Sequence, residues 1–317
     1  VGYAINLGSS GANHLSLASG RLSLTGNNDF TLTRSGSSSG TLTCSANGTL
    51  FLGVGAGRTL TMGVPIANGA GVVEKDGEGT LVLSAGNTST GTFNVNDGTV
   101  RYAAGGGGDL AASTVNILNN GVLDFAGDSD TLATLNLYAG LVTNSAASGA
   151  LTVTALTLGG GPAGTAATVD TGTGTGSLKL GGNMVFSAVN DPNTATLAGR
   201  LDLNGGTRTF TVNNSYAPGA AVDLDIPAII SGGAGYGVTK SGGGVLRLRG
   251  ANTFDGNIYS ADNCGTIIAG HPQALGAPTL GRIISVNNND TLVLDGANGN
   301  IVTPSNYTNL FLNGGGD

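Results

Sequence analysis

The sequence predicts an all-β solenoid, a right-handed parallel β-helix, from three observations. Glycine makes up 58 of the 317 residues and charged residues 10%, whereas average proteins have about 7% and about 25%. Short runs that alternate apolar and polar residues recur along the chain, for example at 81–83 and 292–294. One long sequence module occurs twice. Together these features indicate short strands separated by tight turns.

Composition excludes several other classes of protein. Collagen would need glycine at every third position and more than 8 prolines. Disorder is disfavoured because 39% of the residues are hydrophobic and lie in strand-like runs. The net charge of −7 repels phosphate backbones, so we expect no nucleic-acid partner. No apolar run approaches the ~18 residues of a membrane-spanning helix.

The repeated module is the strongest signal. KDGEGTLVL at 75–83 is echoed by KSGGGVLRL at 240–248, 165 residues further along. At the same offset, NTSTG at 87–91 matches NTFDG at 252–256. Two extra residues in the second copy then shift the next match, which is GTV against GTI. The register therefore persists through several strands.

The similarity extends beyond these segments on both sides. Downstream, strand-like runs at 114–125 parallel those at 283–294, and upstream RTLTM at 58–62 parallels RTFTV at 208–212. We therefore expect a single β-helix domain over 1–317, with duplicated modules at about 58–140 and 208–315.

The local pattern also predicts the number of coils. Strands of three to five residues place Leu, Val and Ile on one face, and Gly, Asn or Asp follows each strand and permits a turn. The roughly thirty strands expected exceed the number in a sandwich, and the aromatic signatures of propeller blades are missing. A solenoid with about 22 residues per coil would have about 14 coils over about 65–70 Å, without significant helix.

The pattern Lys-x-Gly-x-Gly-x-Leu-x-Leu-x-x-x-Asn-x-x-x-Gly, followed by Gly-Thr-Val or Gly-Thr-Ile, resembles the autotransporter-associated β-strand repeat. It occurs at 75–100 and 240–267, and the second copy also has the typical GANTF (250–254) and ALG (274–276). In the first copy, SAGNT at 84–88 departs slightly. The resemblance implies a right-handed parallel β-helix that is secreted or displayed on the surface of a Gram-negative-type bacterium. It does not identify an activity.

Carboxylates are the first candidates for catalysis, because glycoside hydrolysis needs two of them about 5–10 Å apart. Asp223 and Asp225 would share one strand face, and Asp124, Asp128 and Asp130 lie within seven residues. We interpret all five mainly as solvated or turn-forming residues. A loose calcium site at the second group is the alternative. GGGGD at 105–109 superficially resembles calcium-binding nonapeptides but occurs once.

Nucleophile motifs are also matched superficially. GSSSG at 36–40 fits Gly-x-Ser-x-Gly but precedes no predicted helix, and GDSD at 127–130 lacks the final glycine of a protease signature. The two histidines, His14 and His271, would lie many coils apart. We therefore assign no catalytic, cofactor-binding or metal-binding residue and expect no cofactor.

The two cysteines give a geometric expectation. Cys44 and Cys264 are separated by about ten coils, or about 48 Å, whereas a disulfide needs Cα atoms within about 7 Å. We expect two buried thiols and no bond between them. A bond between subunits is the alternative.

Three functions remain open. The first is a structural or adhesive surface protein that is a homo-oligomer through end-to-end stacking, with possible cell-surface or matrix partners. Its motivation is the repeat identity, the absence of catalytic constellations and the acidic, weakly charged surface. Neither terminus offers an amphipathic helix or a charged, proline-rich cap, so we expect either that flanking sequence is missing or that ends stack on ends. The second is a polysaccharide lyase or hydrolase. The third is a stalk fragment of a larger autotransporter passenger.

Overall fold

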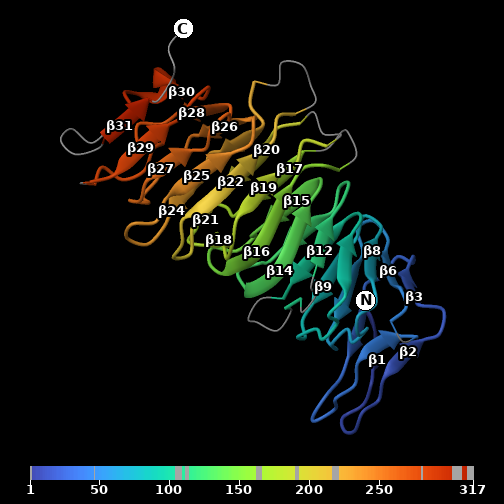
Figure 1. Cartoon of the computed structure of the whole chain (residues 1–317). Coiled ribbons are helices and arrows are strands. Elements are labelled where there is room, and N and C mark those ends of the chain that lie inside the picture. The colour runs from blue at the N-terminus through green and yellow to red at the C-terminus, as the bar shows by residue number, and fades with distance from the viewer. Residues whose placement is uncertain are drawn as a thin grey trace.

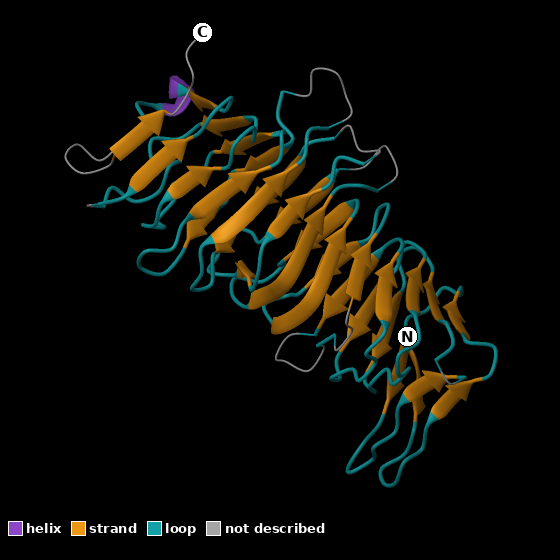
Figure 2. Cartoon of the chain, in the orientation of Figure 1, coloured by secondary structure: helices purple, strands orange, loops and turns teal. Residues whose placement is uncertain are grey.

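The computed structural model describes residues 2–45, 47–103, 109–110, 114–161, 166–189, 193–215, 221–279, 281–301 and 309–312. They form an elongated stack of coils, in which the chain advances from one end of the rod to the other (Figure 1). Every strand pair in the described part is parallel, as the arrows in Figure 2 illustrate. The predicted all-β parallel solenoid is therefore confirmed.

Two long sheets run along the rod. In the described part of the chain the first has 13 strands in sequence order: β1 (Tyr3–Asn6), β4 (Phe30–Thr33), β7 (Thr59–Met62), β9 (Thr80–Leu83), β11 (Thr99–Tyr102), β13 (Val122–Asp124), β15 (Gly140–Thr143), β17 (Ala167–Asp170), β20 (Ala195–Ala198), β23 (Leu224–Ile226), β26 (Val245–Leu248), β28 (Thr266–Ala269) and β30 (Thr291–Leu294).

The second sheet has 16 strands, of which 13 form its main path: β3 (Arg21–Leu24), β6 (Leu50–Val54), β8 (Val73–Asp76), β10 (Thr92–Val95), β12 (Thr114–Ile117), β14 (Ser129–Leu137), β16 (Ala150–Leu158), β19 (Met184–Phe186), β22 (Arg208–Val212), β25 (Val238–Ser241), β27 (Ile258–Ser260), β29 (Ile283–Val286) and β31 (Asn309–Leu312).

A third side of the coil is formed by shorter pieces. Near the N-terminus it consists of β2 (Leu15–Leu17) paired with β5 (Leu42–Cys44), and in the middle of β18 (Ser177–Leu180), β21 (Arg200–Asp202) and β24 (Ile229–Ser231). The nine-residue strands β14 and β16 serve both sides. The first half of β16 pairs with β18 and its second half with β19, so the sheet branches there.

The coils are longer and less uniform than the sequence predicted. Strand partners are 19 residues apart between Thr80 and Thr99 but 30 apart between Phe30 and Leu60. The rod therefore has about 12 turns instead of the predicted 14. Local alternation reveals strands but not how many residues a turn inserts between them, and this explains the miscount.

The core is built from columns of stacked aliphatic side chains. In the first sheet one column is 0–1% exposed and passes through consecutive coils: Leu60, Leu81, Val100, Leu123, Val142, Val169 and Leu197. Fully burying such a side chain contributes about 1.5–3 kcal/mol. Alternation with period two thus sets which side chains enter the core.

The outer face of the second sheet carries an asparagine ladder. Asn136 donates to Asn116 at 2.9 Å, Asn116 donates to Asn94 at 2.7 Å, and Asn94 donates to Glu74 at 2.8 Å. Each step joins adjacent coils. Side-chain hydrogen bonds therefore reinforce the backbone pairing on the outside of the rod as well.

The duplicated modules are partly equivalent in the structure. β8 and β25 lie in the second sheet, whereas β9 and β26 lie in the first. The upstream match is different, because 58–62 forms β7 of the first sheet and 208–212 forms β22 of the second. These two segments therefore resemble each other in strand sequence but do not occupy equivalent places in the fold. The full extent of the duplication, including the part beyond 312 that lies outside the described residues, stays a prediction, as does the right-handed winding.

Helix is limited, in the part of the chain that the structure describes, to one 3-10 turn, η1 (Gly296–Asn298). None of the described residues forms a helix with the length and apolar character needed to cross a bilayer.

Candidate functional sites

Lys75 is the most unusual side chain of the first repeat, because it points into the core and is 0% exposed. Its ammonium donates to the carbonyl oxygens of Gly77 at 2.6 Å, Asp97 at 2.9 Å and Asp76 at 3.2 Å. Asp97 belongs to the next coil, so the ammonium joins two coils. Burial lowers the pKa of Lys75 from 10.5 to about 8, against the opposite influence of Asp97 and Asp76.

Lys240 occupies the same place in the second repeat and is 1% exposed. Its ammonium donates to the carbonyl oxygen of Gly242 at 2.6 Å and to that of Cys264, one coil further on. Burial lowers the pKa of Lys240 as well. A lysine ammonium has three hydrogen-bond donors and no acceptor. Because several carbonyl oxygens converge on it, these donors find partners without a carboxylate. Both repeats therefore place a cation under a turn.

The first glycine of each repeat makes this turn possible. Gly77 and Gly242 both have φ of +76°, a left-handed conformation that side chains disfavour. A Cβ at Gly77 would lie 2.5 Å from the carbonyl oxygen of Val54, and one at Gly242 would lie 2.5 Å from that of Val212. The Lys-x-Gly pattern thus combines a tight turn with the group that binds its carbonyls.

A buried asparagine completes each repeat. Asn87 accepts a hydrogen bond from the backbone N–H of Ile66 at 2.9 Å and donates to the carbonyl of Asp109 at 3.0 Å. These two residues lie one coil before and one coil after it. The side chain therefore adds to the backbone hydrogen bonds between these coils on the third side, where the described residues next to Asn87 form no regular strand.

Asn252 forms the same bonds, accepting from Ile230 N–H at 2.8 Å and donating to the Ala274 carbonyl at 2.6 Å. It is 1% exposed. We call the two pairs, Lys75 with Asn87 and Lys240 with Asn252, the repeat clamps. Each clamp ties its own coil to both neighbours.

The carboxylates singled out in the sequence have structural partners. Asp124 is 2% exposed, pairs with Arg101 at 3.0 Å and accepts from two backbone N–H groups. Asp223 lies just before β23 and not within it, so it does not share a strand face with Asp225. It is 0% exposed and accepts from the N–H groups of Ser215 at 2.7 Å and Val245 at 2.6 Å.

Asp225 points outward and is covered by two arginines. Arg247 donates to it at 2.9 Å, and Arg249 forms a second ion pair with it. Burial alone would raise the pKa of Asp225, but the hydrogen bonds from Arg249 and Arg247 hold it below its ordinary value. The carboxylate stays ionised and bound, and it offers no free proton acceptor to a substrate.

The proposed calcium group does not converge. Asp124 faces Arg101, whereas Asp130 accepts from the Tyr102 hydroxyl at 2.7 Å and from the Leu110 N–H at 3.0 Å. Among the described residues no three His, Cys, Asp or Glu side chains are placed to hold a metal ion. Gly105–Gly108 of the nonapeptide-like segment lie outside the described residues.

The nucleophile-like motifs are turns and strand ends. Ser38 accepts from the Gly40 N–H at 3.3 Å, and Ser129 accepts from the Ala150 N–H at 3.1 Å. His14 shares a hydrogen bond with Thr41 at 2.7 Å, and His271 accepts from the Gln273 N–H at 3.0 Å. Each group therefore has a local partner, and the described residues place no histidine beside either serine.

The cysteines are both free and buried, at 5% and 3% exposed. Cys44 lies in β5, where its thiol donates to Asn68 at 2.9 Å. Cys264 lies just before β28, many coils away, and burial raises the pKa of its thiol. The expectation of two buried thiols is confirmed.

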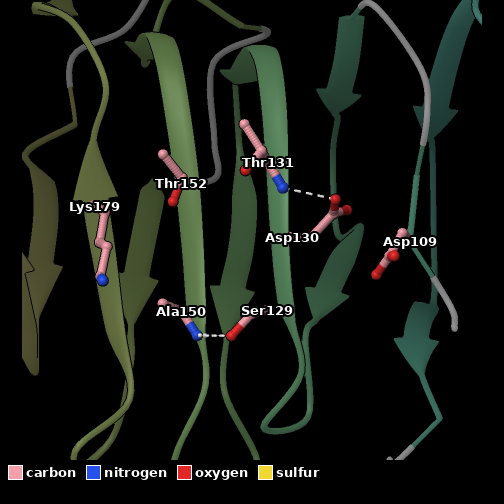
Figure 3. Close-up of a pocket in the computed structure, with 7 residues that line it drawn as sticks. All are labelled: Asp109, Ser129, Asp130, Thr131, Ala150, Thr152 and Lys179. Atoms are coloured by element: carbon pink, nitrogen blue, oxygen red, sulfur yellow. Dashed lines mark hydrogen bonds between the residues drawn. The ribbon is translucent and has the colours of Figure 1, made fainter. Parts of the chain in front are cut away.

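A lateral hollow on the third side was not anticipated from the sequence. It has a volume of about 410 Å³ and is shown in Figure 3. Strands β14, β16 and β18 supply most of its lining, which consists of Asp109, Ser129, Asp130, Thr131, Ala150, Thr152 and Lys179. Because these residues come from four coils, no local motif brings them together. We refer to this set as the lateral hollow.

The role of the buried lysines was also missed, although the sequence contains a signal. Lys75 follows Val73 by two positions, and Lys240 follows Val238 by two. Both lysines therefore occupy inward positions of alternating strands. A lysine at an inward position, two residues before a glycine, could have been interpreted as a buried cap.

The comparisons with known proteins agree with this geometry. The family model of the passenger-associated-transport-repeat matches residues 73–101 and 238–270, the two segments that contain the clamp lysines and asparagines. No curated protein matches the chain, and no solved structure does. The chain is a parallel β-helix that carries two copies of the autotransporter passenger-associated repeat, and this repeat points to a secreted or surface protein of bacteria.

Proposed function

We propose that the protein is a structural or adhesive rod at the bacterial surface and that its copies stack end to end. The observation that carries the proposal is the distribution of exposed large apolar side chains. Among the described residues, six of the eight lie in the first or last strands of the two long sheets: Tyr3, Ile5, Val293, Leu294, Leu310 and Phe311. Val189 and Tyr236 are the other two.

Backbone geometry supports the same arrangement. β1 and β3 end the two long sheets on one side, and β30 and β31 end them on the other. A strand without a neighbour leaves N–H and C=O groups unpaired and can template a further strand. Because every strand pair among the described residues is parallel, a second copy can continue both sheets with the same polarity. Such head-to-tail contacts are heterologous and extend into fibres.

The test compares substitutions at the ends with one in the middle. Phe311→Lys and Ile5→Lys place charges in the proposed interface, whereas Val189→Lys puts the same charge on an apolar side chain that is 64% exposed and lies away from the ends. Light scattering after gel filtration and electron microscopy measure assembly as the concentration rises. We expect higher oligomers for the parent and Val189→Lys, and monomers for the end variants. A parent that stays monomeric at high concentration would refute end-to-end stacking.

A polysaccharide-acting enzyme has less support. Asp124, Asp223 and Asp225 are all engaged by arginines or backbone N–H groups, and Asp130 accepts from the Tyr102 hydroxyl and two backbone N–H groups. Asp109 is thus the carboxylate of the lateral hollow with the best access to a substrate. Release of reducing sugar from acidic glycans, lost in Asp109→Asn, would favour the enzyme. A stalk function predicts neither assembly nor catalysis.

A further inference from the structure

The lateral hollow contains two opposite charges without partners. Asp109 lines one end and Lys179 the other, as Figure 3 shows. Within the described residues neither side chain forms an ion pair or a hydrogen bond. Asp124 and Asp225, by contrast, form ion pairs with arginines. Unpaired charges that face one hollow are available to a ligand.

The floor between the charges is rigid. Thr131 pairs with Thr152 and Thr152 with Lys179 on consecutive parallel strands, so their side chains point outward in one row. Asp130 is fixed by the hydroxyl of Tyr102 and by the N–H groups of Leu110 and Thr131. Ligand binding therefore has little side-chain entropy to remove at Asp130, and the main entropic cost falls on Asp109 and Lys179.

Size and spacing limit the ligand. The volume of about 410 Å³ lies near the small end of the ~300–1,000 Å³ range of ligand pockets. Asp109, β14, β16 and β18 belong to successive coils, and neighbouring strands lie about 4.8 Å apart. The charged ends are thus separated by about 14 Å at the backbone, which suits a disaccharide better than a single sugar.

We propose that the lateral hollow binds a disaccharide unit of a glycan that carries a free amine and an acidic group. The amine lies against Asp109 and Asp130, the sugar hydroxyls contact Thr131 and Thr152, and the acidic group pairs with Lys179. Charge complementarity at both ends sets the orientation. Burial raises the pKa of Asp109, and repulsion by the negative charges of Asp130 and Asp128 raises it further. A bound ammonium would offset this repulsion.

This inference rests on the proposed adhesive function, for which it names the class of ligand. The assay uses four disaccharides that differ in charge: a hexuronic acid linked to glucosamine, its N-acetylated form, the chitosan disaccharide and cellobiose. Isothermal titration calorimetry on the full chain measures their affinities. We expect the zwitterionic disaccharide to bind at least about tenfold more tightly than its N-acetylated form, because one charged contact is lost.

The variants assign each end. Asp109→Asn should remove the preference for the amine, and Lys179→Met should remove the preference for the acid, about tenfold in each case. Glu78→Gln, an exposed carboxylate outside the hollow, is the control. Circular dichroism checks that each variant is folded. Equal affinity for all four disaccharides, or unchanged selectivity in both hollow variants, would overturn the proposal.

Failure of this proposal can be told apart from failure of the rod's assembly. Phe311→Lys, which should be monomeric, keeps the hollow intact and should bind the zwitterionic disaccharide as the parent does. Loss of binding without loss of assembly rejects the ligand alone. Loss of assembly with binding retained rejects the stacking alone.

Discussion

Replacing Lys75 by methionine isolates the contribution of the buried ammonium. Methionine has similar length, so Lys75→Met keeps the packing of the stem in the core and removes the charge and three donors. The carbonyl oxygens of Gly77 and Asp97, bonded at 2.6 and 2.9 Å, then lose this donor. The third bond, to Asp76 at 3.2 Å, is the longest of the three.

The magnitude follows from two opposing effects. Each buried carbonyl left without a partner costs about 1–3 kcal/mol. In the other direction, methionine removes the cost of burying an ammonium, the same cost that lowers the pKa of Lys75 to about 8. We expect the lost bonds to prevail by about 1–3 kcal/mol, because the turn at Gly77 packs closely against the backbone of Val54 and has little room to rearrange.

Urea denaturation followed by circular dichroism measures the change in the free energy of unfolding. Lys179→Met is the matched control, since Lys179 lies on the outer face of β18, and its replacement should change stability by less than about 0.5 kcal/mol. Hydrogen exchange should locate the loss of protection near Gly77 and Asp97. If Lys75→Met is as stable as the parent or more stable, the ammonium is not a net stabilising group and the reasoning is refuted.

Three further predictions concern the clamps. Because the pKa of Lys75 falls from 10.5 in the unfolded chain to about 8 in the fold, the unfolded state binds more protons between these values. The contribution of Lys75 to stability should therefore rise from pH 8 to 10.5. In urea titrations over this range, the difference in the free energy of unfolding between the parent and Lys75→Met should move in the parent's favour, and a constant difference would contradict the lowered pKa. An amine-reactive ester should label Lys179 rapidly and Lys75 and Lys240 slowly, which peptide mapping measures; equal labelling would contradict their burial. Asn252→Ala should lower the free energy of unfolding by about 2–4 kcal/mol, because it leaves two backbone groups unpaired. Asn120→Ala, at an exposed turn, is the control and should change it little. Equal losses of stability in thermal melts of the two variants would rule out the clamp.

The sequence predicted the regular part of the fold because each strand carries its own signal. Alternation at 80–83 or 245–248 determines which residues enter the core, and the repeated module identifies the solenoid. The number of turns was overestimated because turn lengths vary without changing that signal. The distance from Thr80 to its partner is 19 residues, whereas that from Phe30 is 30.

The sites were harder to predict for a related reason. Lys75 and Asn87 act within a motif that could be seen in the sequence. Yet the partners that join them to other coils, the carbonyl of Asp97 and the N–H of Ile66, are backbone atoms, which no side-chain pattern reveals. The lateral hollow depends on pairing between residues 20 to 30 positions apart. Asp109 and Lys179 share no motif, and the register of β14, β16 and β18 brings them to one face.

The placement of the clamps predicts which part of the rod resists proteolysis. A stack of coils has mainly nearest-neighbour contacts, so it frays from its ends one coil at a time. Fraying from either end reaches a clamp after a few coils, at Lys75 or at Lys240, and there it must also break bonds to the adjacent coil. Proteases that remove the outer coils should therefore stall at the repeats, leaving a resistant segment that runs from the first repeat to the second.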